Sequence, residues 1–214
     1  MNKSSIIKSR QVINRSDYGT FMQPKDAVLE EIYLNQAMNN RTIMFVDEFD
    51  RETCYKAIYF LERIERQDDI DEIPMNERTP ITIKINSYGG DVFHCYALIS
   101  VIERLKDRGY AINTHTMGVA FSCGFLLAIT GTHRTIARRG YLMCHQISSG
   151  VIGEIQRMEE EVDFTKEMWE ASVDIIKKYT NITGKQLDHI KRSKVDWYMS
   201  AEESLKLGVT DEIV

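Results

Sequence analysis

The sequence predicts an α/β fold with a largely parallel sheet, because two segments repeat the order of strand, turn and helix. In the first, isoleucines at positions 81, 83 and 85 alternate with polar residues, as in a strand, and a helix at 92–106 follows a glycine pair. In the second, a strand at 111–116 and a turn at 117–121 lead to a helix that starts at Ser122. Strands that alternate with helices in this way pair in parallel.

The remaining elements follow from apolar periodicity and capping signals. The acidic residues 68–79 show no periodicity and are expected to form a loop. The capping boxes Thr183-x-x-Gln186 and Ser200-x-x-Glu203 predict the starts of two helices. The other predicted elements are a helix opening at Pro24, a strand at 42–46, a helix at 51–66, strands at 135–137 and 141–144, and a long helix at 154–180.

Length and composition favour one globular domain. The chain has 214 residues, 43% of them hydrophobic and 28% charged, which is enough apolar material for one core. A formal net charge of −5 makes it a poor partner for nucleic acid or an anionic membrane, and no apolar run approaches the ~18 residues of a membrane span. Residues 1–21 lack the apolar region of a secretory signal, and the four cysteines form no C-x-x-C pair. We expect a cytoplasmic protein with reduced thiols and no metal or organic cofactor.

Ser122 is the candidate nucleophile, since it lies between a strand and a helix. A serine in this position is more often a helix cap, and its hydroxyl is a weak nucleophile unless a base activates it. The positive end of the helix and the backbone N–H of Cys123 are expected to stabilise an oxyanion there. The turn Gly89-Gly90 could supply a second donor, because paired glycines let a backbone N–H approach a substrate, although a tight turn is their commoner use.

His145 and Asp196 are the candidate base and the candidate orienting acid. His145 ends an apolar strand, and Asp196 comes shortly before the last capped helix. Residues of these types at such positions are more often partly exposed polar groups or turn residues. Sequence spacing alone does not bring them to Ser122, because a triad is defined by geometry and recurs in several chain orders.

Four motifs resemble those of the proteolytic-subunit family of the Clp protease, whose fold is shared with the crotonases. They are Ile85-Asn86-Ser87-Tyr88-Gly89-Gly90, Met117-Gly118-x-Ala120-x-Ser122-x-Gly124, Met143-Cys144-His145-Gln146 and Asp196-Trp197-Tyr198-Met199-Ser200-Ala201-x-Glu203-Ser204. The resemblance runs from about Glu31 to the C-terminus. It implies a spiral of ββα units with a protruding helical handle at about 146–195. It also implies Ser122 as nucleophile, His145 as base, Asp196 as acid, and an oxyanion hole made by the backbone of Gly90 and Cys123.

The resemblance further implies a homo-oligomer of two stacked heptameric rings. Peptide bonds would be hydrolysed inside the enclosed chamber, and an AAA+ unfoldase of the Clp type would use ATP to feed it with unfolded chains. Residues 1–30 would form a mobile axial segment, and residues 31–214 a single peptidase domain. Met168 and Trp169, on the predicted long helix, would lie in the contact between rings rather than in the core.

Departures from the family pattern mark a divergent member and leave alternatives open. Tyr88 and Ile147 stand where the family usually has proline, and residues 148–153 keep only part of its glycine-rich substrate strand. One alternative is a catalytically silent ring subunit, and another is a crotonase-type acyl-CoA enzyme with the same fold and glycine turn. A capsid-maturation peptidase that works without an ATPase is a third. A redox or nucleophilic role for Cys123 is a minor alternative.

Overall fold

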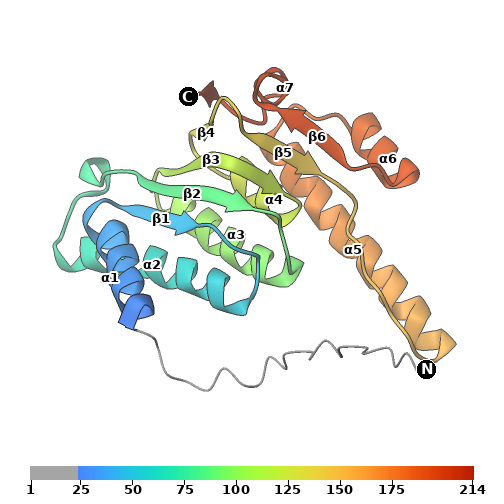
Figure 1. The fold of residues 1–214 in the computed structure, drawn as a ribbon, viewed down its shortest axis with the longest axis horizontal. Helices are drawn as coiled ribbons and strands as arrows, with labels where there is room; N and C mark the ends of the chain where they lie inside the picture. The colour runs from blue at the N-terminus through green and yellow to red at the C-terminus, as the bar shows by residue number, and fades with distance from the viewer. Residues whose placement is uncertain (1–23) are drawn as a thin grey trace, which may run out of the picture.

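A computed structural model describes residues 24–214, and Figure 1 shows their arrangement. In chain order the elements are α1 (Pro24–Asn39), β1 (Thr42–Phe45), α2 (Arg51–Ile70), a 3₁₀ helix (Met75–Glu77), β2 (Ile81–Ser87), α3 (Val92–Asp107), β3 (Ile112–Phe121), α4 (Cys123–Ile129), β4 (Arg134–Ile136), β5 (Tyr141–Cys144), α5 (Ile155–Tyr179), α6 (Gly184–Ser193), β6 (Trp197–Ser200), α7 (Ala201–Lys206) and β7 (Glu212–Ile213). Both predicted capping boxes are formed, at Thr183 and at Ser200.

The sheet is dominated by parallel pairs, which confirms the predicted α/β class. Its main path runs β1-β2-β3-β4-β7, and all four neighbouring pairs are parallel. Strand β5 joins the far end of β3, also in parallel, and β6 pairs with β5 in the antiparallel direction. The short pair β5–β6 therefore lies beside the carboxyl-terminal part of β3, beyond the residues of β3 that pair with β4.

Strand β3 corrects the predicted turn at 117–121, because the strand continues through these residues. Its first half pairs with β2 and β4, and its second half pairs with β5 over residues 119–121. Gly118 lies at the change of partner, where a Cβ would come 2.6 Å from Asn86 Oδ1. The Val119 N–H donates to the same oxygen at 3.0 Å. A glycine that suggests a turn in the sequence thus makes room for the side chain of Asn86.

Helix α2 is longer than predicted and takes up the start of the expected loop at 68–79. Asp68 is 3% exposed, and the Arg41 guanidinium donates to both of its carboxylate oxygens, at 2.8 and 3.0 Å. Asp69 accepts hydrogen bonds from Arg78 and Arg108. Acidic residues that suggest a loop in the sequence are therefore partners of arginines from other segments, which the chain order does not reveal.

The apolar core lies between the sheet and the helices α2, α3 and α4, which cover one of its faces (Figure 1). The alternating isoleucines of β2 are fully buried, as predicted. Burying a side chain of this size stabilises the folded state by roughly 1.5–3 kcal/mol. The largest fully buried side chains include Phe45, Phe49, Phe125, Leu61, Leu98, Ile102 and Leu105.

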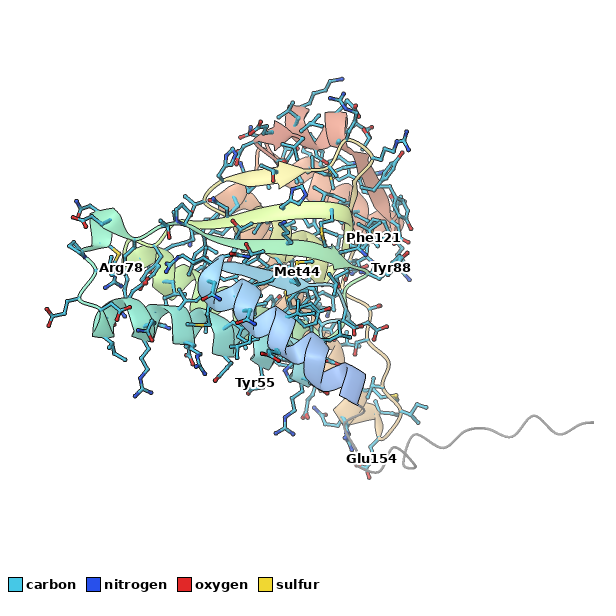
Figure 2. The ribbon with its side chains drawn as sticks, turned by 60° about the vertical axis from the view of Figure 1, so that its left-hand side comes forward. Met44, Tyr55, Arg78, Tyr88, Phe121 and Glu154 are labelled. Carbon is cyan, nitrogen blue, oxygen red and sulfur yellow. The ribbon has the colours of Figure 1, made fainter. Side chains whose placement is uncertain are left out.

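Helix α5 projects from this body, and Figure 2 marks its far end at Glu154, away from the sheet. Its second half packs on the core, where Trp169 is 3% and Met168 is 8% exposed. The prediction that these two residues form a ring–ring contact is therefore wrong, because their own chain buries them. Within residues 24–214, none of the helices has the length and apolarity that crossing a membrane requires.

The expected division of the chain at residue 30 falls inside α1. Residues 1–23, which make up most of the expected axial segment, lie outside the described residues. The division therefore stays a prediction.

Candidate active site

Ser122 lies at a sharp corner between β3 and α4. Its backbone has φ 56° and ψ −117°, a conformation that costs a non-glycine residue of order 1–3 kcal/mol. The helix-cap interpretation is wrong, because the side chain accepts no capping hydrogen bond. Instead the Ser122 N–H donates to the Met143 carbonyl at 2.9 Å, which fixes the corner to β5 and leaves the hydroxyl available for another partner.

That partner is His145. The parallel register of β3 and β5 pairs Phe121 with Met143, so the residues that follow each strand leave the sheet side by side. His145 Nε2 lies 2.8 Å from Ser122 Oγ, which is hydrogen-bond distance. The two residues are 23 positions apart in the sequence, and the strand register brings them together.

Asp196 reaches the other side of the imidazole through β6. In the antiparallel register of β5 and β6, Cys144 pairs with Trp197, so His145 and Asp196 occupy the next position on each strand. His145 Nδ1 lies 3.4 Å from Asp196 Oδ1, and the carboxylate side chain is 52% exposed. Strand β6 is not among the elements predicted from the sequence, although the run Val195-Asp196-Trp197-Tyr198-Met199 is rich in residues that favour strands.

The turn Gly89-Gly90 packs directly against the serine corner. Both residues have positive φ, at 107° and 145°, which favours glycine. A Cβ on Gly89 would lie 2.7 Å from the Ser122 Cβ, and a Cβ on Gly90 would lie 2.6 Å from the Phe49 backbone. Phe49 holds the turn from behind, since its N–H donates to Gly89 O at 2.8 Å and its carbonyl accepts from Asp91 N at 2.6 Å. Neither of these two bonds uses the Gly90 N–H.

Cys123 connects the serine corner to the glycine turn, because it follows Ser122 and its side chain contacts Gly90. It is 4% exposed, and its thiol donates to the Gly90 carbonyl at 3.3 Å. The Cys95 thiol donates to the Cys123 carbonyl at 3.6 Å. The contact between the two side chains lowers the pKa of the Cys123 thiol. Cys123 is the first residue of α4, so its N–H has no partner within the helix. Cys123 lines the site, and its sulfur points to the Gly90 carbonyl.

A ring contact lies beside these turns. Tyr88 precedes the glycine pair and Phe121 precedes the serine, and their rings are 5.7 Å apart in an edge contact, as Figure 2 shows at the ends of β2 and β3. Phe121 in turn meets the ring of Tyr198 at 5.5 Å. Tyr88 is 74% exposed. The residue that replaces the family's proline therefore packs on the segment that carries Ser122.

A pocket of about 450 Å³ opens beside Ser122, Gly90 and His145. Pockets of this size hold small ligands or a few side chains. One wall is a face of α5, which could not be predicted because helical periodicity does not say which surface an apolar stripe meets. The apolar residues of the pocket include Phe125, Leu126, Met168, Trp169 and Ile176. Across residues 24–214, no group of three or more His, Cys, Asp or Glu side chains is arranged to bind a metal ion.

Comparison with known proteins gives one consistent result. The Clp protease family matches residues 24–214 of the chain. The ATP-dependent Clp protease proteolytic subunit of Deinococcus radiodurans is 28% identical over 141 residues, which span 65% of this chain and 67% of that protein. The ATP-dependent Clp protease proteolytic subunit 2 of Chlamydia pneumoniae is 31% identical over 140 residues, 63% of this chain and 64% of that protein. The alignments thus cover about two thirds of each relative. The chain belongs to the Clp protease family, which marks it as a serine-type peptidase.

Proposed function

We propose that the chain is an endopeptidase in which Ser122 attacks the peptide carbonyl, His145 acts as general base and Asp196 orients the histidine. The observation that carries the proposal is the 2.8 Å distance between His145 Nε2 and Ser122 Oγ at a strained strand-to-helix corner. A serine hydroxyl becomes a useful nucleophile when a base at hydrogen-bond distance takes its proton.

The proposed reaction uses groups of the chain itself. As Ser122 Oγ bonds to the carbonyl carbon, its proton moves to His145 Nε2, and the carbonyl oxygen takes up the negative charge. The N–H groups of Gly90 and Cys123 are proposed to donate to this oxyanion. His145 then gives the proton to the leaving amine as the C–N bond breaks. A water molecule releases the acyl group by the same steps, with its proton passing through His145.

Asp196 is proposed to accept from His145 Nδ1–H. This bond would hold the tautomer whose Nε2 accepts a proton and would stabilise the imidazolium that forms. The present distance of 3.4 Å is long for such a bond, and catalytic hydrogen bonds commonly shorten when substrate binds.

The site favours this reaction over the alternatives. A cysteine nucleophile at position 123 is disfavoured because the buried thiol points to the Gly90 carbonyl. The chemistry of a crotonase-type acyl-CoA enzyme does not require a histidine placed between a serine and an aspartate, as His145 is here. The family and the two relatives favour the peptidase over that enzyme. For a silent ring subunit there would be no reason to keep an open pocket beside the serine.

We also propose that the chain works inside an assembly. The names of both relatives include ATP dependence, which supports a partner ATPase of the Clp type that unfolds substrates and feeds them inward. The projecting first half of α5 supports contact between two stacked rings, which we expect to be heptameric, and we place the assembly in the cytoplasm. Short peptides should then be cleaved without the ATPase, and stably folded proteins should resist cleavage until it is added.

Labelling with a fluorophosphonate, which phosphonylates activated serines, tests the proposed nucleophile. Mass spectrometry should find the label on Ser122, and Ser122→Ala should lose both the label and peptide cleavage, a loss on the order of 10⁶ in kcat for a serine-protease triad. The fold should persist, because the Ser122 side chain makes no capping bond. Ser100→Ala, at an exposed serine of α3 outside the pocket, is the control and should keep both. Labelling of a different serine would contradict the assignment.

A further inference from the structure

The pocket beside Ser122 has an unbalanced charge. Its lining includes the carboxylates of Asp91 and Glu161 and the imidazole of His145, and it includes no lysine or arginine. Asp91 is already in use, since its Oδ1 caps α3 by accepting from the N–H groups of Phe93 and His94 at 2.8 and 3.1 Å. Glu161 is the carboxylate that remains for a ligand.

Glu161 has a weak bond and no cation of its own. The side chain is half-buried, and it accepts from Ser149 Oγ at 3.3 Å. Within residues 24–214, none of the lysines or arginines comes within ion-pair distance of it. Lys166, the nearest lysine along the helix, bonds to Asp163 instead, at 2.8 Å. A partly desolvated carboxylate without a counter-charge favours a cationic ligand.

The helix places Glu161 at one end of an apolar wall. Glu161, Met168, Trp169, Ser172 and Ile176 line the same pocket from one face of α5. With a rise of 1.5 Å per residue, Glu161 lies about 10 Å along the axis from Met168. A lysine or arginine side chain has the matching construction, because its methylene stem packs on apolar surface while its charged end stays at a polar group.

The neighbouring pocket has charges of both signs. A second pocket, of about 580 Å³, lies on the other side of His145 and shares Glu161 with the first. Its lining includes Lys166, Lys191 and Lys194, against the carboxylates of Glu161 and Asp196. Two of these lysines already have carboxylate partners, since Lys166 bonds to Asp163 at 2.8 Å and Lys191 bonds to Glu170 at 2.7 Å. Of the two pockets, the one at Ser122 therefore offers Glu161 to a basic side chain without a lysine or arginine in its lining.

We infer that Glu161 gives the peptidase a preference for lysine or arginine at the substrate residue that supplies the scissile carbonyl. The side chain of that residue is attached next to the carbonyl carbon, so it enters the pocket that Ser122, Gly90 and His145 border. The inference rests on the proposed function. Glu161 is a specificity residue in this scheme, and it takes no part in the proton transfers.

The test compares two peptides that differ only at that residue, one with lysine and one with norleucine. Norleucine keeps the methylene stem and lacks the ammonium group. The ratio of kcat/KM for the lysine peptide to kcat/KM for the norleucine peptide should fall about tenfold in Glu161→Gln, as expected when a charge-assisted bond is lost. Glu161→Lys should turn the ratio in favour of norleucine.

Glu159→Gln is the matched control, because it makes the same change at an exposed carboxylate of α5 that lines neither pocket. It should leave the ratio unchanged, and sizing should show the same assembly for all variants. An unchanged ratio in Glu161→Gln, with norleucine cleavage and Ser122 labelling intact, would overturn the inference and leave the proposed function standing. If the fluorophosphonate did not label Ser122 in the unmodified protein, the proposed function would be overturned instead.

Discussion

The two halves of α5 have similar apolar spacing but different surroundings. In the first half, Ile155, Val162 and Phe164 are 73%, 49% and 45% exposed. In the second half, Met168, Trp169, Val173 and Ile176 are buried. Tyr96 of α3 fixes the buried half, since its hydroxyl donates to the Met168 carbonyl at 2.6 Å and contacts Ser172 Oγ at 2.7 Å. Apolar spacing thus predicts the helix but not the partner of its stripe.

The difference assigns separate roles to the two halves. The buried half is part of the core and forms a wall of the pocket at Ser122. The exposed half carries the run Glu159-Glu160-Glu161 and apolar side chains that their own chain leaves uncovered. Glu161 lies where the two meet, with its carboxylate in the pocket. Substitutions of the buried apolar side chains should therefore act on folding, and substitutions of the exposed apolar side chains should act on assembly.

The largest effect on folding is expected from Trp169→Ala. Truncating a buried tryptophan leaves a cavity and typically lowers the free energy of unfolding by about 3–5 kcal/mol. Urea unfolding followed by circular dichroism measures this loss. Ile70→Ala, which truncates an exposed side chain at the end of α2, is the control and should stay within about 0.5 kcal/mol of the unmodified protein. A stable Trp169→Ala that forms smaller particles would return this residue to the ring–ring contact.

The next largest effect is expected from Asp196→Asn, which should lower turnover and leave folding unchanged. An amide can hold the imidazole in the wrong tautomer, and the corresponding change in a serine-protease triad lowers kcat about 10⁴-fold. Since Asp196 is half exposed and 3.4 Å from the imidazole, we expect a loss of at least ~10²-fold. Steady-state peptide cleavage measures it, with the exposed Asp188→Asn of α6 as control. Near-normal turnover would mean that another acceptor orients His145.

Much of the fold could be predicted from local patterns. The isoleucine alternation of β2 and the two capping boxes depend on neighbours in sequence, and each appears where it was predicted. The errors involve distant partners. The strand β3 continues through residues 117–121 because β5 pairs with residues 119–121, and Asp68 is helical and buried because Arg41 binds it. Neither partner is visible in a local window.

The candidate site divides in the same way. The residue types of Ser122, His145 and Asp196 could be selected from the sequence and the family resemblance, but their distances depend on two strand registers. The pocket could not be predicted, because it needs α5 to fold back on α4. In the sequence Glu161 is one of three consecutive glutamates with nothing to set it apart, and the bond from Ser149 is what distinguishes it from Glu159.

Ile155→Asp tests the exposed half of α5. Burying this side chain in a ring–ring contact would contribute roughly 1.5–3 kcal/mol per subunit, and an aspartate there would remove that gain. We expect smaller particles by size-exclusion chromatography with light scattering and lower peptide cleavage. The free energy of unfolding of the dissociated chain should change by less than about 0.5 kcal/mol. Ile70→Asp, at the exposed end of α2, is the control. Unchanged particle size in Ile155→Asp would remove the first half of α5 from the assembly contact.

The smallest effect on stability is expected at the C-terminal end of α5, where Glu103 of α3 binds the helix. Lys178 Nζ and the Tyr179 hydroxyl both donate to Glu103 Oε1 at 2.8 Å. Burial alone would raise the pKa of the Glu103 carboxyl, but these bonds outweigh it, and the pKa lies below the ordinary value of 4.5. A lowered carboxyl pKa stabilises the folded state above the unfolded pKa, and this stabilisation is lost as the pH falls through the folded pKa.

Glu103→Gln should therefore destabilise the protein at pH 7 by about 0.5 kcal/mol, since Lys178 is largely exposed and solvent screens the pair. Urea unfolding at neutral pH and at successively lower pH values should show the difference from the unmodified protein shrinking once the pH passes below about 4.5. Asp107→Asn, an exposed carboxylate on the same helix, is the control. If the difference persisted undiminished in acid, the loss would come from the packing of the side chain, and the charge of Glu103 would not be what fixes the end of α5.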